Sequence, residues 1–187
     1  MGGAMTILQE HRTVKPTGVE RTFGSEEVIV SKTDLKGHIT YANNVFSRVA
    51  GYRREQLIGA PHSIVRHPDM PRCVFKLLWD TIQSGHELFA YVKNLAKNGD
   101  HYWVLAHVTP SYDDKGQIVG FHSNRRLPTP EALATIEPIY AQVLAEENRH
   151  EDRRQGLAAG SNALQALLRD RGIEYDRFVF SLAADAA

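Results

Sequence analysis

Runs of hydrophobic and polar positions divide the first part of the chain into two short strands. A β-rich run at residues 28–30 is followed by an alternating run at residues 39–41. The turn between them contains Gly37, which supplies the positive φ of a tight hairpin. The pattern therefore predicts two antiparallel strands that are neighbours in the sheet.

Residues 43–84 have the spacing of several short helices. Asn43 or Asn44 can cap the first helix, and Gly51 can end it. A rigid, helix-breaking stretch at residues 68–71 precedes a longer amphipathic helix. Its apolar positions fall on one face, which predicts a core role for all of them: Val74, Phe75, Leu78, Trp79 and Ile82.

Three further strands are predicted in a meander at residues 88–95, 101–112 and 118–125. The first two flank Asn98-Gly99, a pair typical of hairpin turns. The order of strand, strand, helices and three strands predicts an α+β fold. We expect a five-stranded antiparallel sheet with short helices on one face and room for a ligand between the layers.

The segment after Leu127 changes to helical periodicity. Thr129 can cap a helix that starts with Pro130, and a second helix is predicted to end at Gly172. The chain is thus divided into a flexible or loosely docked N-terminal arm at 1–24, a domain at 25–127 and a helical C-terminal extension at 128–187. The apolar faces of the extension must pack against the sheet or another chain.

Composition narrows the classes of function. The 187 residues include 42% hydrophobic and 24% charged residues, with 22 Lys and Arg against 22 Asp and Glu. This balance argues against a nucleic-acid partner, and no apolar run approaches the length of a membrane span. The single cysteine, Cys73, excludes an intramolecular disulfide and a cysteine-based zinc site, so we expect a cytoplasmic protein.

Three stretches carry a resemblance to a known family. They are Thr33–Asn43, the Arg-His-Pro-Asp-Met-Pro run within Pro61–Pro71, and Lys93–Val104. Together they resemble the PAS domain of the aerotaxis-receptor subgroup over roughly residues 25–127. The Arg-His-Pro-Asp-Met-Pro run is far more specific than the strand pattern.

The resemblance implies a cytoplasmic sensor that binds FAD non-covalently and reports redox or oxygen status. It places Arg66, His67 and Asp69 near the polar parts of the flavin, and Asn43 and Asn94 along the pocket. Arginine offers a fixed fork of donors, and an asparagine amide offers a donor and an acceptor to a ring edge. A signalling partner, such as the chemotaxis machinery, and a homodimer are also expected.

Two departures from the subgroup keep other functions open. Leu88 stands where the subgroup commonly has tryptophan, and Leu95-Ala96 replaces its basic pair. One alternative is a cofactor-free interaction or dimerisation module whose pocket is filled by Phe89 or Tyr91. Another is a haem gas sensor with one of four histidines as the axial ligand: His86, His101, His107 or His122.

The Arg66–Asp69 run also has a purely structural interpretation, in which Asp69 caps the next helix and pairs with Arg66. No residues indicate catalysis or a metal site. The serines lack a nucleophile elbow, the glycines form no phosphate loop, and the histidines lack metal-ligand spacing. Cys73 is expected to be a buried, inert thiol. We therefore predict a protein that is not an enzyme.

Overall fold

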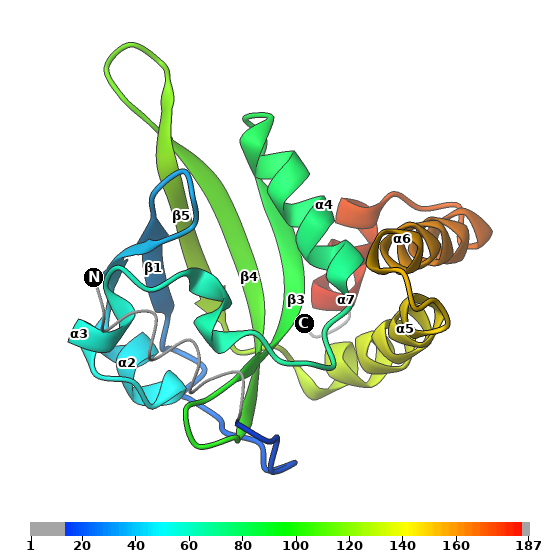
Figure 1. Ribbon diagram of the computed structural model, residues 1–187, viewed down its shortest axis with the longest axis horizontal. Coiled ribbons are helices and arrows are strands. Elements are labelled where there is room, and N and C mark those ends of the chain that lie inside the picture. The colour runs from blue at the N-terminus through cyan, green and yellow to red at the C-terminus, as the bar shows by residue number, and fades with distance from the viewer. Residues whose placement is uncertain (1–13, 185–187) are drawn as a thin grey trace.

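The fold is described for residues 14–184 in a computed structural model (Figure 1). One five-stranded sheet has the order β2-β1-β5-β4-β3, and its neighbouring strands are antiparallel. The strands are β1 (Ile29–Thr33), β2 (Ile39–Ala42), β3 (Leu88–Leu95), β4 (His101–Tyr112) and β5 (Ile118–Arg126). This confirms the predicted α+β architecture and the predicted antiparallel sheet.

The turns follow the predicted glycines. Gly37 adopts φ 81° between β1 and β2, and Gly99 adopts φ 94° between β3 and β4. β1 pairs with β5, with Ser31 opposite Ser123. This pairing joins strands that are distant in the sequence, so sequence proximity alone does not predict it. Ser31, Ser123 and Arg125 therefore share one face, because alternate strand residues point the same way.

That face is covered by the segment between β2 and β3. The segment forms α2 (Asn44–Ala50), α3 (Arg54–Leu57), the 3-10 helix η1 (His62–Val65) and α4 (Arg72–Gln83). Asn43 caps α2: its Oδ1 accepts from Phe46 N at 3.0 Å, and Gly51 ends the helix with φ 73°. The predicted start and end of the first helix in this segment are confirmed.

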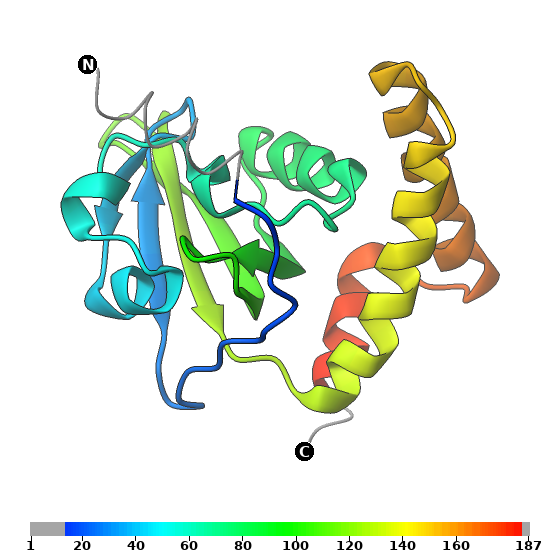
Figure 2. The same cartoon turned by 60° about the horizontal axis from the view of Figure 1, so that its bottom comes forward.

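Three helices form the C-terminal extension: α5 (Pro130–Asn148), α6 (Arg153–Asp170) and α7 (Tyr175–Ala184). Thr129 caps α5 through its contact with Ala132 N at 3.2 Å, and Pro130 is the first helical residue, as predicted. The sequence pattern does not predict α7, because it ends the last helix at Gly172, whereas the structure has a further helix after it. The three helices gather beside the β3 edge, as Figures 1 and 2 show.

The extension contacts the rest of its own chain at two places, the sheet and helix α4. On the sheet side, Tyr140 of α5 donates from its hydroxyl to the carbonyl oxygen of Tyr91 at 3.0 Å. Phe180 of α7 lies with its ring 4.7 Å from that of Phe89. On the helix side, α6 packs against α4. The extension thus joins the outer surface of β3 to the helix that covers the inner face.

A buried carboxylate fixes the contact with α4. Glu147 of α5 has no exposed surface, and its Oε2 accepts from Arg72 N at 2.9 Å and from Arg72 Nε at 2.8 Å. Its Oε1 accepts from Cys73 N at 2.8 Å. Glu147 therefore caps the N-terminus of α4 from a distant part of the chain. Asp69 does not cap α4 and instead pairs with Lys93 at 3.2 Å.

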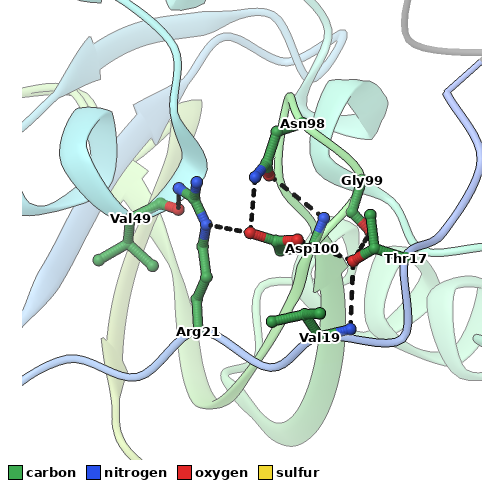
Figure 3. A network of polar contacts seen from close by, with 7 residues as sticks. All are labelled: Thr17, Val19, Arg21, Val49, Asn98, Gly99 and Asp100. Carbon is green, nitrogen blue, oxygen red and sulfur yellow. Dashed lines mark hydrogen bonds and ion pairs between the residues drawn. The ribbon is translucent and has the colours of Figure 1, made fainter.

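The described part of the N-terminal arm, residues 14–24, runs along the turn between β3 and β4 (Figure 3). Thr17 N donates to the Gly99 carbonyl at 2.8 Å, and the Thr17 hydroxyl donates to Asp100 Oδ1 at 2.7 Å. Arg21 Nε meets Asp100 Oδ2 at 3.0 Å, and its Nη1 donates to the Val49 carbonyl at 3.1 Å. The arm therefore ties α2 to the sheet. The rest of the arm, residues 1–13, lies outside the described residues.

Candidate ligand-binding cavity

A cavity of about 490 Å³ lies between the sheet and the helices that cover it, within the size range of small-molecule sites. Its floor is the inner face of four strands, and its walls come from η1 and α4. Apolar strand residues form much of the floor: Val92, Val104, Ala106, Val108 and Phe121. These apolar side chains point into the cavity because they alternate along each strand with neighbours on the other face of the sheet.

Aromatic side chains from α4 form one wall. Trp79 and Phe75 line the cavity, and the Trp79 ring meets Phe121 edge-on at 5.5 Å. Gly37 makes room for this indole, because a Cβ there would lie 2.9 Å from the Trp79 ring. The sequence pattern assigned Trp79 to the core. In the structure it is only half-buried and offers an aromatic surface to the cavity.

The charged side chains that line the cavity are cationic, and two of them, Arg72 and Lys76, are paired with carboxylates outside the lining, Glu147 and Asp80. Among the described residues that line it, the charged side chains are Lys36, Arg66, Arg72, Lys76 and Arg125, with no Asp or Glu. The Arg66 guanidinium lies 4.1 Å from the centre of the Phe75 ring, and burial lowers the pKa of Arg66. This lining is complementary to a ligand with an aromatic body and negative charge.

The most deeply buried cation is Arg125 on β5, which is 2% exposed. Its Nη2 donates to the Ser31 hydroxyl, and its Nη1 lies 3.3 Å from His62 Nε2. Burial and the neighbouring Arg125 charge lower the pKa of His62 to about 3, so its ring is neutral and can accept from Arg125. The guanidinium also lies 4.5 Å from the centre of the Phe46 ring.

Two of the five predicted site residues line this cavity. Arg66 and Asn94 both contribute to it, and their backbones form an isolated antiparallel bridge. Asn94 lies on β3 and is 4% exposed. The bridge brings the Arg-His-Pro-Asp segment against the central hairpin, which joins the two stretches that carry the family resemblance.

The other three predicted residues lie elsewhere. His67 is buried beside His101, with its ring edge-on at 5.9 Å, and burial lowers its pKa to about 4. Asp69 lines a separate hollow of about 410 Å³ between the hairpin and α5. Asn43 is engaged in capping α2 and in donating from Nδ2 to the Val28 carbonyl at 2.8 Å. None of the three is among the residues that line the cavity.

Leu88 and its aromatic neighbours do not fill the cavity. Leu88 is buried on β3, and neither it nor Phe89 or Tyr91 is among the lining residues. Phe89 stacks on His107 at 4.0 Å on the side of the sheet that faces α7. An aromatic surface is provided instead by Trp79, which sequence reasoning did not select.

Within residues 14–184, no cluster of His, Cys, Asp or Glu side chains has the arrangement of a metal site. Of the four histidines considered as haem ligands, only His122 is among the residues at the cavity. Sequence reasoning also missed His62, Ser31 and Arg125. Polar residues at alternate strand positions next to a predicted pocket were the available signal for Ser31 and Arg125.

Comparison with known proteins agrees with this geometry. Residues 39–125 match the family described as the PAS fold. The chain contains a PAS domain. The cavity lies inside this domain, and the extension formed by α5, α6 and α7 follows it.

Relatives of this PAS domain occur within several longer proteins. The aerotaxis receptor of Escherichia coli is 44% identical over 120 residues, which cover 64% of this chain and 24% of the receptor. The nitrogen fixation regulatory protein of Klebsiella pneumoniae is 29% identical over 67% of this chain and 24% of that protein. The chain thus spans about a quarter of the length of these relatives.

A solved structure shows the same fold. The light-state structure of the blue-light photoreceptor Aureochrome1 LOV has a TM-score of 0.51 and 25% identity. The match covers 65% of this chain and 91% of that chain.

None of the described helices combines the length and the apolar character needed to cross a membrane.

Proposed function

We propose that this PAS domain binds FAD in the cavity between the sheet and α4 and relays redox or oxygen status to a signalling partner. The proposal rests on the aerotaxis-receptor relationship together with a cavity that combines an aromatic wall and a cationic lining that includes the buried Arg125. Arg66, Asn94 and Trp79 would hold the flavin. FAD would supply the electron transfer, and the protein would contribute binding and electrostatics.

The route from the cavity to the extension follows two elements. β3 carries Asn94 toward the cavity and, on its other side, Phe89 against α7. α4 carries Trp79 toward the cavity and is capped by Glu147 of α5. A change in hydrogen bonding or charge at the cavity would shift both contacts, and the extension would present that change to its partner.

The expected setting is a cytoplasmic protein without a catalytic site of its own, acting by protein–protein contact. The chemotaxis machinery is the proposed partner class, and a homodimer is the proposed assembly. Hydrogen exchange tests the relay. Amides in α5 and α7 should differ in protection between oxidised and dithionite-reduced flavoprotein, while equal protection in both states would contradict it.

A flavin titration tests the binding proposal. Flavin-free protein is titrated with FAD while flavin fluorescence is followed. Trp79→Leu and Arg66→Ala should each weaken binding by about tenfold or more, equivalent to about 1.4 kcal/mol. Arg126→Ala is the matched control, since Arg126 is exposed and absent from the cavity lining. Failure of the wild-type protein to bind FAD would overturn the proposal, as would unchanged binding in both cavity variants.

The alternatives give different results in the same experiments. Haem would produce a Soret band that is lost on replacement of its histidine ligand. An interaction module without a cofactor would bind neither group. Neither Phe89 nor Tyr91 lines the cavity, so these side chains leave it open, which favours a ligand-binding function over that last alternative.

A further inference from the structure

The cavity contains a buried positive charge that its own protein does not neutralise. Arg125 is 2% exposed, and its recorded polar contacts are the neutral side chains Ser31 and His62. Its Nε has no hydrogen-bond partner among the described residues. A buried cation without an anion costs several kcal/mol, so a negative group nearby would stabilise an arginine in this position.

The neighbouring titratable groups do not provide that anion. His62 is neutral at physiological pH because burial and the Arg125 charge lower its pKa. Tyr102 of β4 lies on the same side of the sheet, and burial raises its pKa, so its phenol stays protonated. Its hydroxyl also lacks a hydrogen-bond partner within the described part of the chain. Glu147 is occupied by Arg72 and Cys73 at the far end of α4.

We propose that Arg125, Ser31 and His62 form an anion subsite where β5, β1 and η1 meet, and that Arg125 is the counter-charge for negative charge on the ring system of the bound ligand. This inference rests on the proposed flavin function. Two-electron reduction of a flavin with uptake of one proton leaves one negative charge on the ring at neutral pH. Arg125 would therefore favour the reduced ligand over the oxidised one, and would raise the midpoint potential.

Packing holds the guanidinium in place before any ligand arrives. The Phe46 ring lies 4.5 Å from its centre and stacks on His62 with ring centroids 5.8 Å apart. A donor group fixed in advance loses little conformational entropy when it meets a negative charge. The subsite is thus preorganised by the core of the domain and differs from the more exposed cations at the cavity edge.

The test compares riboflavin binding in two oxidation states. Riboflavin lacks phosphate, so any charge effect comes from the ring. Dissociation constants are measured for oxidised riboflavin and, anaerobically, for dithionite-reduced riboflavin with wild-type protein, Arg125→Met and the control Arg126→Met. Arg125→Met should raise the reduced-to-oxidised ratio of dissociation constants about tenfold, which corresponds to a midpoint lowered by about 30 mV for a two-electron couple. Arg126→Met should leave the ratio unchanged.

The outcomes separate the two proposals. A wild-type protein that binds flavin in neither state contradicts the proposed function. Normal binding with an unchanged ratio in Arg125→Met contradicts the subsite alone. Weaker riboflavin binding in Arg125→Met that is equal in both oxidation states also overturns it, because Arg125 would then not act on the charge of the reduced ring.

A measurement on wild-type protein keeps the proposal testable even if Arg125→Met fails to fold. In an ¹⁵N-labelled sample, the Arg125 Nε–H resonance should move on binding oxidised riboflavin and move further on reduction. The Arg126 resonance, from the exposed neighbour, should move in neither step. An Arg125 resonance that does not respond to reduction would overturn the subsite.

Discussion

Replacement of Glu147 by glutamine should loosen the C-terminal extension from the sensory domain. The carboxylate is fully buried and accepts three hydrogen bonds, two at Oε2 from Arg72 and one at Oε1 from Cys73 N. Glutamine has one acceptor oxygen, so its NH₂ group must face an N–H donor in either orientation. The change also leaves the Arg72 guanidinium without its carboxylate partner at a largely buried site.

The expected cost is about 3 to 5 kcal/mol, the range for breaking a buried ion pair by removing one member. Close packing adds to it, since Gly160 of α6 is so near that a Cβ there would lie 2.4 Å from Glu147 Cγ. Little space is therefore available for Glu147 or a glutamine to rearrange. The cost should appear both as lower global stability and as exposure of α5 and α6.

Urea denaturation and limited proteolysis measure these two effects. Glu146→Gln is the matched control, because the adjacent Glu146 pairs with the exposed Arg149 at 2.7 Å and should change stability by less than about 1 kcal/mol. Glu147→Gln should be cut faster within the extension than wild type. If Glu147→Gln loses no more stability than Glu146→Gln, the inferred anchoring of α4 by α5 is wrong.

Three further predictions concern other parts of the molecule. Hydrogen bonds from Thr17, Asn98 and Arg21 lower the pKa of Asp100 to about 2 from its ordinary value of 3.8. The ionised Asp100 therefore stabilises the fold above pH 4, and this stabilisation is lost as the pH falls through 2. Acid unfolding of Asp100→Asn should lack this loss of stability. Burial and the Glu147 carboxylate raise the pKa of Cys73 to about 12, so iodoacetamide at pH 8 should modify the thiol only after the protein unfolds. Rapid labelling of the native protein would contradict the buried state of Cys73. Gly37→Ala should lower the stability of the fold by about 2 kcal/mol and Gly116→Ala by less, because both glycines have positive φ but only Gly37 faces the Trp79 ring. Equal losses of stability in thermal melts would show that the contact with Trp79 is unimportant.

Local sequence patterns predict many of the turns and helix starts of the fold. The hairpins at Gly37 and Gly99, the Asn43 cap and the Thr129-Pro130 helix start all appear in the structure where the sequence predicted them. Each depends on residues only a few positions apart. The short helix α7 was missed because its start follows Gly172 closely, and packing of Phe180 on β3 accompanies it.

The cavity was less predictable, because it depends on residues brought together from distant parts of the chain. Trp79 has the spacing of a core residue, yet the turn at Gly37 leaves its ring at the cavity. Arg125 has the pattern of an ordinary strand-end charge, and only pairing of β5 with β1 places it beside Ser31. Glu147 caps a helix 75 positions away, a relation that no local motif encodes.

The visible absorption spectrum of freshly purified protein, followed by denaturation and identification of any released chromophore, tests the flavin assignment most directly. The proposed function predicts bands at about 450 nm and release of FAD on unfolding, with less bound flavin in purified Trp79→Leu than in Arg126→Ala. A colourless protein that also fails to take up added FAD in either oxidation state would contradict it.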